Sequence, residues 1–119
     1  MNMNRNRSVV LVVGLDRSRE LPLIAALERH GYETLAARDG FEALQTAIDR
    51  DVDVLITEDE MPGLTGRELI GIVRKHRAIG HCLLISDLVA PFEPEQLLIK
   101  IREFLPALID EAVEKVSYA

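Results

Sequence analysis

The amino-acid sequence predicts a doubly wound α/β domain, in which helices cover both faces of a parallel sheet. Short runs rich in β-branched and apolar residues alternate along the chain with segments that repeat apolar residues at helical spacing. Such an alternation forms parallel sheets with right-handed crossovers. The chain has 119 residues, of which 48% are hydrophobic, enough for one domain with its own core. We expect this domain to span residues 9–119, behind a disordered tail over residues 1–8.

The first half of the chain predicts two strand and helix units. Residues 9–13 form a continuous apolar run that ends at Gly14, which is typical of a buried strand. A helix is expected from Ser18 to His30, with an apolar face made by Leu21, Leu23, Ile24 and Leu27. Residues 32–36 alternate as a second strand. Asp39 and Gly40 then open a helix whose apolar face carries Phe41, Leu44 and Ile48.

The second half repeats the pattern. Residues 52–57 predict a third buried strand, and Thr65 with Glu68 has the spacing of a capping box that starts a helix with Leu69, Ile70 and Val73. Residues 82–86 predict a fourth strand, where Cys82 is a small buried hydrophobe. A last helix is expected over about residues 94–117, with Pro94 at its first turn.

Composition excludes several classes of function. The net charge of −6 opposes direct nucleic-acid binding. Neither a signal peptide nor an apolar stretch of roughly 20 residues is evident, so we expect a cytoplasmic protein without a membrane partner. The three histidines follow no ligand pattern, and no nucleophile-histidine-acid order appears. The sequence therefore predicts a protein that is not an enzyme and has no cofactor.

Function should lie where the predicted strands end. In open α/β sheets, ligands collect at the carboxyl ends of the strands. Asp16 follows the first strand, the acidic run from Glu58 through Asp59 to Glu60 follows the third, and Ser86 ends the fourth. These three places are therefore where functional residues are expected.

Several short motifs resemble the receiver domains of bacterial response regulators, the CheY-like domains. They are the strand at residues 9–13, His30-Gly31-Tyr32, Asp39-Gly40, Glu42-Ala43-Leu44, Met61-Pro62-Gly63 and Gly66. The resemblance implies a flavodoxin-like fold with the strand order 2-1-3-4. It also implies a role in two-component signal transduction.

The resemblance fails at the family's functional positions. Receivers use an acid pair after strand one for Mg²⁺, an aspartate acceptor after strand three, a Ser or Thr after strand four and a lysine before a later proline. Here Gly14-Leu15 replaces the acid pair, Glu58 replaces the acceptor and Ala90 replaces the lysine, while Ser86 keeps the hydroxyl. Phosphoryl transfer depends on positioning and charge neutralisation, so we expect no metal and a degenerate site.

A deletion accompanies these replacements. Ser86 is followed almost directly by Pro91 and the last helix, so the family's fourth helix and fifth strand are missing. Strand four should then have an open edge, and the last helix is apolar over a broad arc. We expect a homodimer through this edge or this helix, whose apolar residues are Leu97, Leu98, Ile101, Phe104, Leu105, Leu108 and Ile109. Alternatively, the helix folds back over its own domain.

The sequence thus predicts an atypical, phosphorylation-independent receiver that acts by contact with a signalling protein. Glu58 either mimics a phosphorylated aspartate by its fixed charge or belongs to a solvated acidic loop. Asp16 is either a helix cap or, with Asp59, part of a vestigial acidic site. One alternative is a functional phosphoacceptor in a phosphorelay with a relaxed site. Another is a flavodoxin-like domain that binds a small ligand.

Overall fold

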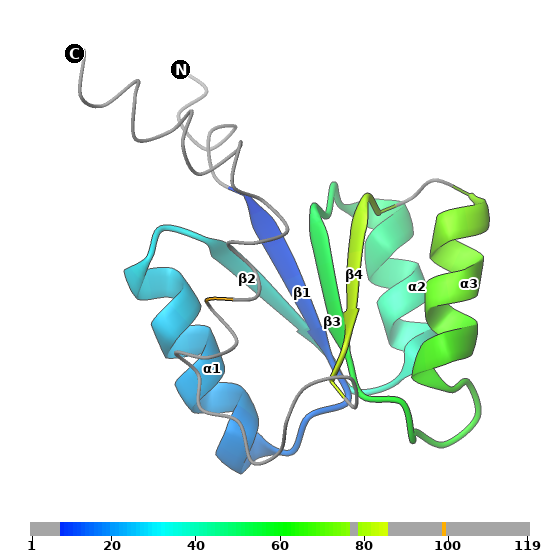
Figure 1. The fold of residues 1–119 in the computed structure, drawn as a ribbon, viewed down its shortest axis with the longest axis horizontal. Coiled ribbons are helices and arrows are strands. Elements are labelled where there is room, and N and C mark those ends of the chain that lie inside the picture. Colours follow the sequence, from blue (N-terminus) through cyan, green and yellow to red (C-terminus); the bar gives the residue numbers. More distant parts are fainter. Residues whose placement is uncertain (1–7, 77–78, 86–98, 100–119) are drawn as a thin grey trace.

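The computed structural model describes residues 8–76, 79–85 and 99, and strands and helices alternate through it (Figure 1). In chain order they are β1 (Val9–Val13), α1 (Arg17–Arg29), β2 (Glu33–Ala37), α2 (Gly40–Asp49), β3 (Val54–Thr57), α3 (Gly66–Lys75) and β4 (His81–Leu84). The predicted doubly wound class is confirmed. The predicted tail and last helix lie outside the described residues, apart from Ser8 and Ile99.

The sheet is parallel and has the order β2-β1-β3-β4, as predicted. Val12 of β1 lies opposite Ala36 of β2 and Ile56 of β3, and Ile56 lies opposite Leu83 of β4. Every residue of β3 is buried. Apart from Thr57, the two central strands are apolar because both of their faces are covered, which is why their sequences do not alternate. In the described part of the chain, β4 pairs with β3 alone.

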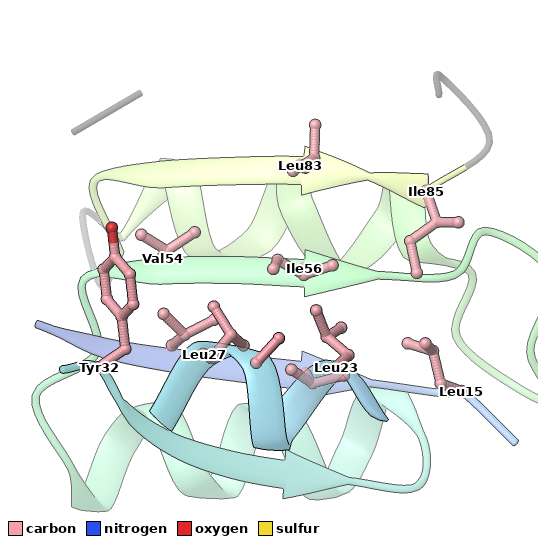
Figure 2. Close-up of a cluster of buried hydrophobic side chains, with 11 residues drawn as sticks. Leu15, Leu23, Leu27, Tyr32, Val54, Ile56, Leu83 and Ile85 are labelled. Carbon is pink, nitrogen blue, oxygen red and sulfur yellow. The ribbon is translucent and has the colours of Figure 1, made fainter. Parts of the chain in front are cut away.

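The helices divide between the two faces of the sheet. The ribbon in Figure 1 shows α1 on one side and α2 with α3 on the other. The α1 side has a core, drawn in Figure 2, of Val10, Val12, Leu15, Leu23, Ala26, Leu27, Tyr32, Val54, Ile56, Leu83 and Ile85. The opposite core contains Leu11, Val13, Ala37, Ala43, Val52, Leu55, Leu69, Val73, Ile79 and Cys82. None of the helices described is long and apolar enough to cross a membrane.

The predicted apolar face of α2 is right at Leu44, which packs against the core, and wrong at Phe41 and Ile48. Phe41 and Ile48 leave 63% and 77% of their surface exposed, while Gly40 and Ala43 are buried. The helix turns its smaller residues toward the sheet, which lets it approach closely. Part of the Phe41 ring lies against Gly63, whose added Cβ would meet the ring at 2.9 Å. Leu21 of α1 is likewise exposed, and that helix packs through Leu23, Ala26 and Leu27.

Local signals fix where α2 and α3 begin. The Asp39 carboxylate accepts from the backbone N–H of Glu42 at 2.9 Å. The predicted capping box is present, since Glu68 N–H donates to Thr65 Oγ1 at 3.1 Å and Thr65 N–H donates to Glu68 Oε1 at 2.9 Å. These bonds satisfy amide donors that a helix start otherwise leaves free. They therefore anchor the loops that follow β2 and β3.

Cys82 is buried on β4, as its apolar neighbours predict. Burial raises the pKa of its thiol, although nearby Arg74 acts in the opposite direction. The thiolate is the reactive form of cysteine. Burial therefore disfavours the reactive form, and Cys82 packs in the core on the α2 and α3 side of the sheet.

Candidate functional site

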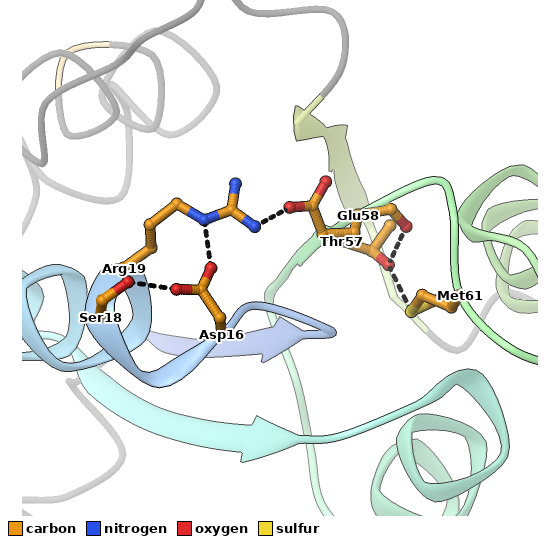
Figure 3. Close-up of polar contacts among 6 residues, drawn as sticks. All are labelled: Asp16, Ser18, Arg19, Thr57, Glu58 and Met61. Carbon is orange, nitrogen blue, oxygen red and sulfur yellow. Dashed lines mark hydrogen bonds and ion pairs between the residues drawn. The ribbon is translucent and has the colours of Figure 1, made fainter.

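The candidate site lies where β1 and β3 end; Figure 3 shows its polar residues. The backbone of Glu58 continues the pairing of these strands, because its N–H donates to the carbonyl of Val13 at 3.1 Å. Gly14 and Asp16 follow β1 directly, and α1 begins at Arg17. The end of β3 and the start of α1 thus face each other across the carboxyl edge of the sheet.

Arg19 joins the two acids of this site. Its Nε donates to Asp16 Oδ1 at 2.6 Å, and its Nη2 donates to Glu58 Oε2. Asp16 also accepts from the hydroxyl of Ser18. The side chains of Asp16 and Arg19 are 55% and 43% exposed, but that of Glu58 is only 20% exposed. Exposed ion pairs contribute about 0.2–1 kcal/mol, so this contact sets geometry more than stability.

These bonds leave Asp16 strongly acidic. Its pKa falls from 3.8 to about 2, first because of the Ser18 hydroxyl and then because of Arg19. The same hydrogen bond to Asp16 raises the pKa of Arg19, and Glu58 adds to this effect. Both groups are therefore charged throughout the physiological range.

The acid titration of Asp16 tests this arrangement. A carboxyl whose pKa is lowered by folding stabilises the fold above its unfolded pKa of 3.8, and this contribution disappears as the pH falls toward 2. Side-chain carboxyl NMR should give a midpoint near 2 for Asp16. Ser18→Ala and Arg19→Gln should each raise the midpoint, and the double variant should bring it close to 3.8. Arg17→Gln, a change at an exposed neighbour, should leave it unchanged.

Gly14 adopts a backbone that favours glycine and lies under Met61. Its φ is +82°, and a Cβ at this position would lie 2.6 Å from Met61 Sδ and 3.4 Å from Glu58 Cβ. Met61 also lies beside Thr57, whose hydroxyl donates to the Glu58 carbonyl at 2.8 Å and is 3.9 Å from the Met61 sulfur. The thioether of Met61 therefore occupies the space above the carboxyl end of β1.

Leu15 belongs to the hydrophobic core. It is buried in the cluster on the α1 side with Leu23 and Ile85, as Figure 2 shows. Burying a leucine contributes roughly 1.5–3 kcal/mol. One of the two positions at which receivers carry an acid therefore packs the fold here.

Asp59 points away from Glu58. Its carboxylate accepts from the backbone N–H and from Nε of Arg67, both at 3.2 Å, on the side of α3. Glu58 instead contacts Arg19 of α1, which covers the other face of the sheet. This is the alternation that neighbouring residues show at a strand end. Asp59 therefore fixes the start of α3 and is not positioned beside Glu58.

The residues at this site do not fit Mg²⁺, which the receiver resemblance implies. Mg²⁺ prefers octahedral oxygen ligation. Here Gly14 and Leu15 supply no side-chain oxygen, and an arginine already bridges Asp16 and Glu58. No cluster of three or more His, Cys, Asp or Glu side chains able to hold a metal occurs in residues 8–76, 79–85 and 99.

The structure brings together only some of the residues that the sequence singles out. Asp16 and Glu58 share one guanidinium, and Asp59 is separate. Asp16 occupies the predicted cap position of α1, but its side chain makes no hydrogen bond to the backbone of that helix, so it is not a side-chain cap. Ser86 and Ala90 lie outside the described residues, as do the predicted dimer residues.

Arg19 is the residue that sequence reasoning missed. A signal was present, because a cation in the first turn of a helix opposes the helix dipole and needs a compensating anion. Asp16 stands three residues earlier, at the spacing of a helical ion pair. The contact with Glu58 has no local signal, since it depends on how α1 packs beside β3.

Comparison with known proteins agrees with the geometry. No protein-family model matches the chain. Chemotaxis protein CheY4 of Vibrio cholerae superimposes with a TM-score of 0.72 at 30% identity, over 83% of this chain and 99% of that one. Response regulator TrrA of Thermotoga maritima, solved in complex with Mg²⁺ and BeF, gives 0.69 at 30% identity with the same coverage.

A longer protein is also similar in sequence. The DNA-binding response regulator MtrA of Mycobacterium tuberculosis is 24% identical, over 98% of this chain and 59% of that protein. The chain therefore spans about three fifths of the length of the curated relatives that it matches first.

The fold and its likeness to these solved receivers define a CheY-like receiver domain. The chain belongs to the response-regulator receiver family of two-component signalling.

Proposed function

We propose that this domain is a receiver that works without phosphorylation, through contact with a signalling protein. The observation that carries the proposal is the pairing of Arg19 with Glu58, the residue at the family's acceptor position. A carboxylate already held by a guanidinium is a poor nucleophile. A glutamate also places its carboxylate about an ångström further out than aspartate, and a misplacement of this size can cost on the order of a hundredfold in rate.

The surroundings of Glu58 support the same proposal. TrrA, at 30% identity, is a receiver in complex with Mg²⁺ and BeF. In the present chain the corresponding edge carries Gly14, Leu15 and Met61, which offer neither an acid nor open space. Without a metal, the charge that develops on a transferring phosphoryl group has little to neutralise it. The proposed domain therefore acts through the surface with which it contacts a signalling protein.

Acetyl phosphate labelling tests the proposal. The purified chain, incubated with acetyl phosphate and Mg²⁺, should keep its unmodified intact mass, while a typical receiver treated in parallel should gain one phosphoryl group. Glu58→Asp should also remain unmodified, since Arg19 and Leu15 are unchanged. A hydroxylamine-labile adduct on the wild type would instead support the phosphorelay alternative, with Asp16 or Asp59 as acceptor.

We propose further that the chain forms a homodimer, through the open edge of β4, the last helix or both. The support is that β4 pairs with β3 alone in the described part of the chain. Beside β4 lies a cavity of about 340 Å³, lined by Arg67, Ile70, Gly71, Arg74, Cys82 and Leu84. An edge strand presents unpaired backbone groups and commonly requires a cover.

Light scattering decides the oligomeric state. At tens of micromolar the wild type should have the mass of a dimer, and Leu97→Asp with Ile101→Asp should reduce it to that of a monomer if the last helix makes the contact. The control is Leu21→Asp, at an exposed leucine of α1, which should leave the mass unchanged. A monomeric wild type would contradict the dimer.

A further inference from the structure

The family's cation is a metal, but the described site already holds a cation of its own. Arg19 makes one bond to Asp16 at the start of α1 and another to Glu58 at the end of β3. Figure 3 shows the guanidinium between the two carboxylates. A guanidinium presents its donors in a rigid planar fork, which suits two acceptors that approach from different elements.

The charges at this point require such a cation. Two carboxylates that meet at one guanidinium lie close enough to repel each other when the guanidinium is removed. Glu58 is the less exposed of the two, so water screens its charge less. Asp59 is already paired with Arg67, and Asp16 is otherwise bonded to a neutral hydroxyl. Within the described part of the chain, Arg19 is therefore the group that balances both acids.

From this geometry we infer that Arg19 is the resident cation of the receiver site and takes over the charge-neutralising and positioning role that Mg²⁺ has in the family. The inference rests on the proposed function and explains how a receiver can keep its acidic edge ordered without a metal. The guanidinium occupies one oxygen of each carboxylate, Oδ1 of Asp16 and Oε2 of Glu58, and places a positive charge where a metal would have to bind. Arg19 is thus a positioning residue that holds Glu58 in one place and excludes divalent cations.

Removal of Arg19 is expected to raise the affinity of the site for Mg²⁺. If Arg19 is the resident cation, its removal leaves Asp16 and Glu58 as two uncompensated carboxylates, and Mg²⁺ is commonly held by one or two carboxylates. Arg19→Gln should therefore bind Mg²⁺ at least about tenfold more tightly than the wild type. In the variant, Mg²⁺ no longer has to displace the charge-assisted hydrogen bonds between the guanidinium and the carboxylates. A residue that only stabilised the fold would not produce a gain of affinity.

Titration with MgCl₂, followed by the backbone amide NMR signals of Gly14, Asp16 and Glu58, measures this effect. The wild type should show no saturable change, and Arg19→Gln should show one. Arg19→Lys keeps the charge, so its Mg²⁺ affinity should be only slightly higher than that of the wild type. Arg17→Gln, on the same helix turn, should behave as the wild type, and Glu58→Gln added to Arg19→Gln should abolish the binding.

Two results would overturn the inference: saturable Mg²⁺ binding by the wild type as tight as that of Arg19→Gln, or no binding by folded Arg19→Gln. If Arg19→Gln does not fold, the comparison moves to Arg19→Lys, whose point charge should still admit more Mg²⁺ than the wild type; equal affinity then refutes the inference. Labelling of the wild type by acetyl phosphate would refute the proposed function alone, because the Mg²⁺ titration contains no phosphoryl donor.

Discussion

Gly66→Ala is expected to lower the free energy of unfolding by about 3 kcal/mol. Gly66 is the first residue of α3, and a Cβ there would lie 2.1 Å from the carbonyl oxygen of Glu58 and 2.9 Å from Leu84 Cδ1. The nearest obstacle is backbone, which cannot rotate aside as a flexible side chain can. The N–H of Gly66 also donates to the Asp59 carbonyl at 2.8 Å, so moving α3 outward would break that bond.

Gly71→Ala is the matched control in the same helix. Nothing lies within 4 Å of a Cβ at Gly71, so alanine there should raise the free energy of unfolding by about 0.5–1 kcal/mol through its better helix propensity. Urea unfolding followed by circular dichroism measures both variants. Equal stability of Gly66→Ala and the wild type would mean that the end of β3 is not packed against α3 as described.

Restoring the family's acid pair is expected to damage the fold instead of repairing the site. The double variant Gly14→Asp with Leu15→Asp should lose roughly 3–5 kcal/mol of stability, from the apolar burial of Leu15 and the left-handed backbone of Gly14. A Cβ at position 14 also requires Met61 to move. Placing a carboxylate where Leu15 packs adds the cost of burying charge.

Thermal and urea unfolding of the double variant, with and without Mg²⁺, test this expectation. Leu21→Asp serves as the control, because that leucine is exposed and should cost under about 0.5 kcal/mol. A double variant as stable as the wild type, and newly labelled by acetyl phosphate, would show that the receiver site had been repaired by two substitutions.

Much of the fold follows from local patterns in the sequence. The runs that became β1 and β3 are apolar because both faces of a central parallel strand are covered, and their positions were predicted within about two residues. The start of α3 was predicted from Thr65 and Glu68 because a capping box involves only neighbours in the chain. Strand order came from the resemblance to receivers, and the sheet confirms it.

The features that could not be predicted from the sequence depend on contacts between helices and strands. The helical spacing of Phe41, Leu44 and Ile48 describes an apolar stripe, but only Leu44 packs against the core. Close approach of α2 to the sheet brings Gly40 and Ala43 inward and leaves Phe41 and Ile48 exposed. Similarly, Arg19 and Glu58 are far apart in the chain, and their contact exists because α1 packs beside β3. Periodicity reports which residues share a face, and packing decides which face is inside.

The place of Leu15 in the core has a consequence for the history of the chain. An active receiver needs an acid at the end of β1, whereas this fold draws packing energy from the leucine that stands there. Mutation of Glu58 to aspartate alone would leave Leu15, Met61 and Arg19 as they are, and restoring the acid first would weaken the domain before any function returned. If the domain works without phosphorylation as proposed, each single substitution back toward an acid-bearing site is expected to be neutral or harmful, so the change would be hard to reverse one substitution at a time.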